Sequence, residues 1–164
     1  IFKSNTNSHQ DVNINNYCVT EEIRSQKISS IVSKISSIKE VRKFLVKEQR
    51  KIGESGGLVA EGRDIGTTVF PHAELKIFLT ASIDERAKRR KSDKNSKDSQ
   101  EIDLHRLKEL IKKRDFEDSN REISPLIKAN DAIEIITDGY KINEVVDKII
   151  DLYSDKIPKE TEIK

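Results

Sequence analysis

The chain has 164 residues, of which 37% are charged and 34% apolar, and its formal net charge is +2. This near-neutral balance gives no global basic field, so a strong nucleic-acid binder is not expected. No apolar run approaches the ~18–20 residues that span a bilayer, and the start shows no signal-peptide pattern. One cysteine cannot form an internal disulfide, which fits a reducing compartment, so we expect a cytoplasmic location.

The sequence begins with Ile1 and contains no methionine. A complete translated chain starts with methionine, so we expect a fragment or a processed segment. Cys18 and three scattered histidines show no metal-ligand spacing, and no metal-binding residue is expected.

The N-terminal third is expected to form a hairpin and two helices. Extended segments are predicted at residues 1–3 and 11–15, joined by a polar loop over 4–10. Thr20, followed by Glu21 and Glu22, is the expected N-cap of a helix that reaches about residue 35. A second helix is predicted over 39–52 and ends at glycines.

Three short apolar runs follow, at residues 58–60, 75–79 and 132–136, and each precedes a helix or turn signal. Ser82 and Glu85 form a capping-box pattern that opens a helix. Asp103 is the expected cap of a long helix to about Arg121, and an amphipathic helix is predicted over 141–153. Strands that alternate with helices predict an α/β fold with a parallel sheet and flanking helices.

Residues 57–64, GLVAEGRD, have the glycine spacing of a P-loop, G-x-x-x-x-G-K-[ST], but Arg63 and Asp64 replace Lys and Ser/Thr. A P-loop has its strand before the first glycine, whereas here the apolar residues lie between the glycines. We therefore expect 58–60 to be a strand that delivers Glu61 to Asp64 into the ligand crevice of the sheet. The alternative is a strand that ends in a salt-bridged surface turn.

The long predicted helix changes character along one face. With a rotation of ~100° per residue, the apolar residues in the first half of the helix and the charged residues in its second half lie on the same face. Charges on an inward face need partners, and an anionic, hydroxyl-bearing ligand would supply them. The alternative is an ordinary surface salt bridge. The residues of this face are Leu104, Leu107, Ile111, Arg114, Asp118 and Arg121.

The basic segment over residues 86–97 is expected to be mobile. It is either a solvated face or a lid that closes over a phosphate site and neutralises charge that develops during group transfer.

The stretches GGLVAEGRDIGTTVFPHAELKIFLTASIDERAKRR and LKELIKKRDFEDSNREISPL resemble the bacterial cytidylate kinases, which are P-loop nucleoside monophosphate kinases. The resemblance covers roughly residues 18–153. It implies transfer of the γ-phosphoryl group of ATP to CMP or dCMP with Mg²⁺. It also implies a monophosphate-binding insert at 1–36, a kinase core at 37–157 with a lid at about 83–102, and a tail at 158–164.

The resemblance further implies roles for individual residues. Those expected to contact substrate or act in catalysis share a polar or charged side chain. They are Ser33, Arg42 and Asp64 at the cytosine ring, Arg63 and Arg121 at the acceptor phosphate, Arg114 and Asp118 at the sugar, and Arg86, Arg89 and Arg90 in the lid at the ATP phosphates, with Arg63, Arg121 and Arg89 as the catalytic residues.

The chain departs from the family pattern in three respects. Glu117 and Ser119 stand where the family is richer in arginine, and the segment IITDGYKINEV differs on the adenine side. No G-x-x-x-x-G-K-[ST] motif occurs in the sequence. The first core strand and the P-loop would therefore precede Ile1, and the fold is expected to be incomplete at its N-terminus. For the same reason, the chain alone is expected to be inactive. The protein is expected to be a monomer or part of a larger fused chain, since in cyanobacteria such kinases occur behind a pantoate-activating ligase. The alternative function is a non-catalytic nucleic-acid-binding or regulatory module derived from a kinase fold.

Overall fold

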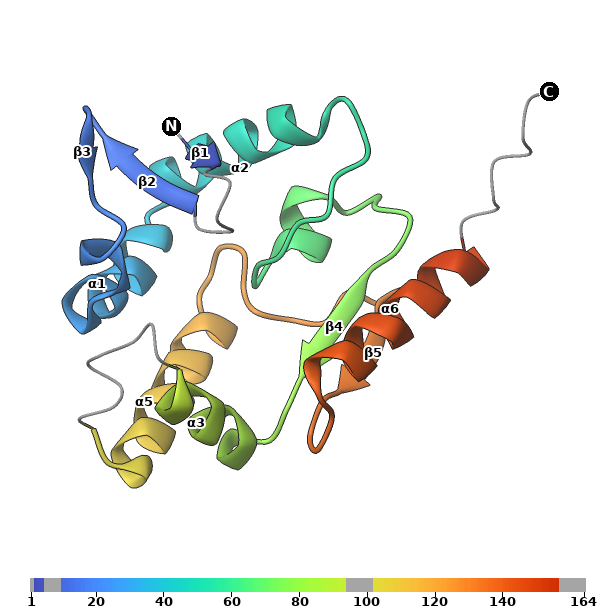
Figure 1. The fold of residues 1–164 in the computed structure, drawn as a ribbon. Helices are drawn as coiled ribbons and strands as arrows, with labels where there is room; N and C mark the ends of the chain where they lie inside the picture. Colours follow the sequence, from blue (N-terminus) through green and yellow to red (C-terminus); the bar gives the residue numbers. More distant parts are fainter. Residues whose placement is uncertain (1, 5–9, 94–101, 157–164) are drawn as a thin grey trace.

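The computed structural model describes residues 2–4, 10–93 and 102–156 (Figure 1). Three predicted segments therefore lie largely or wholly outside the described residues. They are the hairpin loop expected over 4–10, the second half of the expected lid and the tail expected over 158–164. The elements are β1 Phe2–Ser4, β2 Gln10–Ile14, β3 Tyr17–Cys18, the 3₁₀ turn η1 Glu22–Arg24, α1 Gln26–Ser36, α2 Lys39–Gly53, the π-helical turn η2 Ile65–Val69, β4 Ile77–Thr80, α3 Ile83–Ser92, α5 Leu104–Ser119, β5 Ile133–Ile136 and α6 Ile142–Lys156.

The N-terminal hairpin is confirmed. β1 and β2 pair antiparallel, with Phe2 opposite Val12, and a third strand that was not predicted, β3, pairs with β2. Asn15 and Asn16 connect β2 to β3 with φ values of 47° and 69°. Two successive positive φ angles define a type I′ turn, and asparagine tolerates that conformation better than most residues. The Asn-Asn pair therefore explains the third strand.

The predicted N-cap of the first helix is wrong. Ser25, and not Thr20, caps α1, because its hydroxyl accepts a hydrogen bond from the backbone N–H of Ile28 at 3.4 Å. The Thr20 hydroxyl instead accepts from the backbone N–H of Val12 at 2.9 Å. Thr20 thus provides a hydrogen-bond acceptor for the backbone of β2. The acidic Glu22 that follows lies in the short turn η1.

The later helices begin where their caps predict. The Ser82 hydroxyl accepts from the backbone N–H of Glu85 at 3.2 Å, and an Asp103 carboxylate oxygen accepts from the N–H of Arg106 at 2.9 Å. These bonds satisfy helix donors that have no partner within the helix. The helices predicted over 39–52 and 141–153 are confirmed as α2 and α6.

The sheet of the α/β fold consists of β4 and β5, which pair in parallel with Ile77 opposite Ile133. This confirms two of the three predicted strands. The third, over residues 58–60, is wrong: within the described chain this segment pairs with no strand, Leu58 is 43% exposed and Val59 is fully exposed. Apolar composition favours a strand, but a strand also needs a neighbour for its backbone hydrogen bonds.

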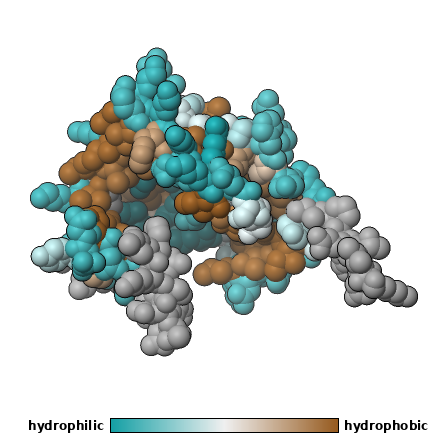
Figure 2. Space-filling view, turned by 90° about the horizontal axis from the view of Figure 1, so that it is seen from above, coloured by the Kyte–Doolittle hydropathy of each residue, from teal (hydrophilic) through white to brown (hydrophobic). Residues whose placement is uncertain are grey.

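Polar side chains make up much of the interior. Among the described residues that are buried, six are polar and only four are apolar. Apolar side chains reach the surface in several places, as the brown areas of Figure 2 show. Buried polar groups need partners, so a cluster of buried polar side chains is the place to look for a functional site. Its residues are Arg42, Asp64, Lys76, Asp118, Ser124 and Thr137.

Candidate functional site

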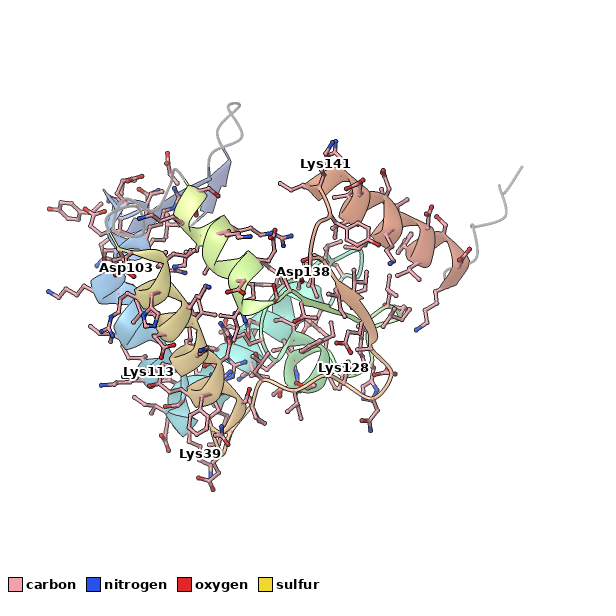
Figure 3. All side chains as sticks on the ribbon, turned by 90° about the horizontal axis from the view of Figure 1, so that it is seen from below. Lys39, Asp103, Lys113, Lys128, Asp138 and Lys141 are labelled. Carbon is pink, nitrogen blue, oxygen red and sulfur yellow. The ribbon has the colours of Figure 1, made fainter. Side chains whose placement is uncertain are left out.

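From Leu107 onward, the inward face of α5 has the predicted phase, whereas Leu104, which was predicted on this face, is 36% exposed. Leu107 is 1% exposed and Asp118 is 2% exposed, while the side chain of Lys113, next to Arg114 in sequence, is 74% exposed and points away from the molecule (Figure 3). The charged end of this face is therefore buried at Asp118 and Arg121, whose side chains are 3% and 10% exposed, while the Arg114 side chain is 38% exposed. This contradicts the alternative of an ordinary surface salt bridge.

The loop after residues 58–60 brings Arg63 to α5 and Asp64 to α2. Gly62 precedes Arg63, and a Cβ atom at Gly62 would lie 2.7 Å from the side chain of Ile65, so this tight turn requires glycine. Asp64 begins the π-helical turn η2, in which its carbonyl accepts from the N–H groups of Thr68 and Val69. The turn fixes the backbone on which Asp64 sits, and Asp64 is 5% exposed.

Arg42 on α2 is the partner of Asp64. Its Nη2 donates a hydrogen bond to an Asp64 carboxylate oxygen, and its Nε donates to the Ser124 hydroxyl at 3.2 Å. Burial, together with the nearby charge of Arg121, lowers the pKa of Arg42 from its usual value. The contact with Asp64 offsets part of the cost of burying this cation.

Asp118 is the centre of the cluster. Its carboxylate lies 3.0 Å from Arg63 Nη1, 3.4 Å from Arg121 Nη1 and 3.7 Å from Arg114 Nε. These arginines come from the loop after residues 58–60, from α5 and from the segment that follows it. A single buried carboxylate thus lies within ion-pair distance of three guanidinium groups. Burial lowers the pKa of Arg114, and the charge of Arg63 adds to the effect.

Asp115 extends the cluster to the basic helix α3. It accepts a hydrogen bond from Arg63 Nη1 at 3.1 Å, and it binds Arg86 through two nitrogens, one of them at 3.1 Å. Burial alone would raise the pKa of Asp115, but the hydrogen bonds from Arg86 and Arg63 hold this pKa below its usual range. Asp115 is therefore a carboxylate at neutral pH.

These contacts form a cluster of Asp115, Asp118 and four arginines between α3, α5 and the loop after residues 58–60. The Arg42–Asp64 pair joins this cluster through Ser124, which accepts hydrogen bonds from both Arg42 and Arg121. The cluster and the pair together are called the network. Its five arginines and three aspartates leave two positive charges. That residual charge, presented by planar donor groups, suits a dianionic phosphate. The members are Arg42, Arg63, Arg86, Arg114, Arg121, Asp64, Asp115 and Asp118.

Of the predicted lid residues, Arg89 makes its hydrogen bonds outside the network, whereas Arg90 lies near enough to Arg114 for its charge to lower the pKa of Arg114. Arg89 is bound to the end of β5: its Nη1 donates to the Thr137 hydroxyl at 2.8 Å and its Nη2 to the Thr137 carbonyl at 2.6 Å. Its Nε donates to Glu85 at 2.8 Å. Arg90 is exposed on α3. Asp138, which follows Thr137, accepts from the backbone N–H of Ser82 at 2.8 Å and so lies at the start of α3 (Figure 3).

Sequence reasoning missed Asp115 and Ser124. Asp115 lies three residues before Asp118, a spacing that places both on one side of a helix, and this signal could have found it. Ser124 carries no such signal, because its role depends on the contact with Arg42 on a distant helix. The predicted Ser33 lies in α1, and its side chain is outside the described part of the structure.

No metal centre and no membrane span emerges from the described residues. Within 2–4, 10–93 and 102–156, no three His, Cys, Asp or Glu side chains gather in a way that could hold a metal ion. Over the same ranges, no helix combines the length and apolar character needed to cross a membrane.

Comparison with known proteins is informative at this point. A sequence profile of the family described as cytidylate kinase matches residues 2–155. Three similar relatives from Prochlorococcus marinus are each called bifunctional pantoate ligase/cytidylate kinase. That of strain MIT 9301 is 93% identical over 99% of this chain and 32% of its own length. The relative from strain CCMP1986 is 75% identical over 100% of this chain and 32% of its own length. The relative from strain NATL1A is 52% identical over 97% of this chain and 31% of its own length. The chain thus spans about a third of the length of these relatives.

Proposed function

This chain belongs to the cytidylate kinase family, and on that premise we propose that its arginine–aspartate network is the acceptor site of an ATP-dependent CMP/dCMP kinase. The observation that carries the proposal is the cluster in which the buried Asp118 carboxylate lies 3.0, 3.7 and 3.4 Å from Arg63, Arg114 and Arg121. In this class of reaction the protein mainly positions the phosphoryl group and stabilises its charge. A fixed group of arginines supplies both.

The Arg42–Asp64 pair is proposed to select the base, with Ser33 as the third contact. Cytosine presents a donor at N4 and an acceptor at N3, whereas uracil reverses this pattern. A buried arginine beside a buried carboxylate offers a donor and an acceptor side by side, which matches the cytosine edge. Such a site rejects the wrong base because a buried polar group would lose its partner.

Arg63 and Arg121 are proposed to bind the acceptor phosphate and act in catalysis, while Arg114 and Asp118 hold the sugar hydroxyls. The arginine fork binds a phosphate through two parallel hydrogen bonds. Asp118 contacts all three of these arginines, so it would align the sugar and phosphate contacts with each other.

The basic helix α3 is proposed to be part of the lid that faces the ATP phosphates. Arg86 supports this because Asp115 accepts hydrogen bonds from both Arg86 and Arg63, and Arg63 is proposed to bind the acceptor phosphate. Arg89 and Arg90 are proposed to complete the lid, with Arg89 as a catalytic residue. For Arg89 this requires exchange of its Thr137 contacts for phosphate oxygens, a movement of the kind that lids undergo on closure.

The division of the chain follows from this reading. We propose that residues 1–36 form the monophosphate-binding insert, 37–157 the kinase core and 158–164 a tail.

The sequence holds no G-x-x-x-x-G-K-[ST], so the ATP phosphate cradle would come from another part of the natural protein. The described residues do not by themselves fit a metal site. Any Mg²⁺ is therefore proposed to be bound mainly by the nucleotide phosphates and by that other part. A cytoplasmic monomer, or a domain of a fused chain, is the proposed state.

A coupled assay of the full-length natural protein tests the proposal. With ATP and Mg²⁺ we expect it to phosphorylate CMP and dCMP far faster than UMP, AMP or GMP. Failure to phosphorylate any pyrimidine monophosphate would refute it. The family match favours this reading over a nucleic-acid-binding or regulatory module, which would instead give salt-dependent RNA binding that ignores CMP.

A further inference from the structure

We propose that Ser124 is a positioning residue that fixes Arg42 and Arg121 from a single point and so couples the base-binding and phosphate-binding ends of the site. This inference rests on the proposed function. It adds a residue to which neither the motifs nor the comparisons assign a role. It is carried by three separate observations: a side-chain contact, a backbone contact and an unusual backbone conformation.

The side-chain contact fixes Arg42. The Ser124 hydroxyl accepts from Arg42 Nε at 3.2 Å, and Arg42 Nη2 binds Asp64. A planar guanidinium group that is held at two of its nitrogens has a defined plane. Both Ser124 and Arg42 are buried, at 7% and 8% exposure, so water does not compete easily for this bond. Loss of the hydroxyl would leave Nε as a buried donor without its partner.

The backbone contact fixes Arg121. The Ser124 carbonyl accepts from Arg121 Nε at 2.7 Å. Arg121 Nη1 then lies 3.4 Å from Asp118 and 3.5 Å from the Ser36 hydroxyl. Ser124 therefore holds both arginines by the same atom, Nε, and leaves their Nη groups directed toward the carboxylates of the network. A displacement of Ser124 would move both guanidinium groups together.

The backbone of Ser124 is strained. Its φ is 52°, in the left-handed region where a residue other than glycine is unusual, and it precedes Pro125, which favours an extended conformation instead. Two bonds hold the loop in place: the one from Arg121 and another from the Leu126 N–H to the Asp118 carbonyl at 2.8 Å. Glycine would adopt this conformation without strain but has no hydroxyl to offer Arg42. The serine is thus explained by the bond that its side chain makes.

Two substitutions in the full-length natural protein separate the hydroxyl from the backbone. Ser124→Ala removes the hydroxyl and keeps the strain, whereas Ser124→Gly removes both. We expect each to raise the KM for CMP about tenfold, the scale of one lost hydrogen bond to a charged group, and to change kcat less. Ser119→Ala, at an exposed serine of α5, is the matched control and should be silent. Thermal melts establish that each variant folds.

A double-mutant cycle with Arg42→Lys tests the side-chain contact between Ser124 and Arg42 directly. Lysine has no Nε–H of the guanidinium type, so Ser124→Ala should add little to the effect of Arg42→Lys. Fully additive effects would overturn the inference, as would a Ser124→Gly variant with the KM of the wild type. If the wild type phosphorylates CMP and both Ser124 variants match it, this inference alone fails. If the wild type does not phosphorylate CMP, the proposed function and this inference fail together.

Discussion

Arg63 Nη1 lies 3.0 Å from an Asp118 carboxylate oxygen, although the two residues belong to a loop and a helix that are far apart in the sequence. The same Arg63 nitrogen contacts Asp115 at 3.1 Å. Arg63 therefore joins the part of the network that contains Arg121 to the part that contains the basic helix α3. This connection would let the acceptor site and the lid respond to the same phosphate.

Arg121→Lys in the full-length protein tests the phosphate assignment. Lysine keeps the charge but loses the planar fork and the Nε donor that binds the Ser124 carbonyl. We expect kcat/KM to fall at least tenfold for both CMP and dCMP, since both substrates carry the same phosphate. Lys113→Ala, one residue before Arg114 and 74% exposed, is the control on the same helix. Steady-state kinetics in which Lys113→Ala is as damaging as Arg121→Lys would show that the helix face is wrongly assigned.

Asp118→Asn tests the sugar assignment. The carboxylate is buried among three arginines, so its replacement by alanine would leave uncompensated charges and cost roughly 3–5 kcal/mol of stability. Asparagine keeps the shape and is the better probe. Because a sugar contact can sense the 2′-hydroxyl, we expect the ratio of kcat/KM for CMP over dCMP to change. Equal losses for the two substrates would assign Asp118 a purely structural role.

Asp115→Asn tests the link to the lid. The substitution weakens the charged hydrogen bonds from Arg63 and Arg86 and should loosen α3 relative to α5. We expect kcat to fall about tenfold and the KM for CMP to change less, because Arg86 is proposed to act on the ATP phosphates. Glu117→Gln, which alters an exposed pair with Lys113, is the control. An unchanged kcat would remove Asp115 from the mechanism.

The 164-residue chain by itself is expected to show no CMP phosphorylation above background. The network proposed to bind the acceptor is present in it, but no phosphate-binding glycine loop occurs in its sequence. The measurement is CDP formation from ATP and CMP, with the full-length protein as positive control. Turnover by the purified chain, free of contaminating kinase, would contradict this expectation.

Local patterns predicted the helices and the charged face of α5 because caps and a 3.6-residue period act within one element. The same patterns gave wrong predictions at two places. At residues 58–60, strand formation depends on a neighbouring strand, and at Thr20 the hydroxyl accepts a hydrogen bond from the Val12 backbone N–H instead of capping a helix. Asp115 and Ser124 escaped notice because their roles come from tertiary contacts. The π-helical turn after Asp64 likewise has no simple sequence signal.

The most direct test of the acceptor-site assignment is the ratio of kcat/KM for CMP over UMP in the full-length protein and its Asp64→Asn variant. Asp64 is buried and bound to Arg42, so the amide replaces an acceptor with a group that also donates. The account predicts that the CMP preference falls by roughly 1–3 kcal/mol, which is about 5- to 160-fold. An unchanged ratio, with both activities reduced together, would contradict it.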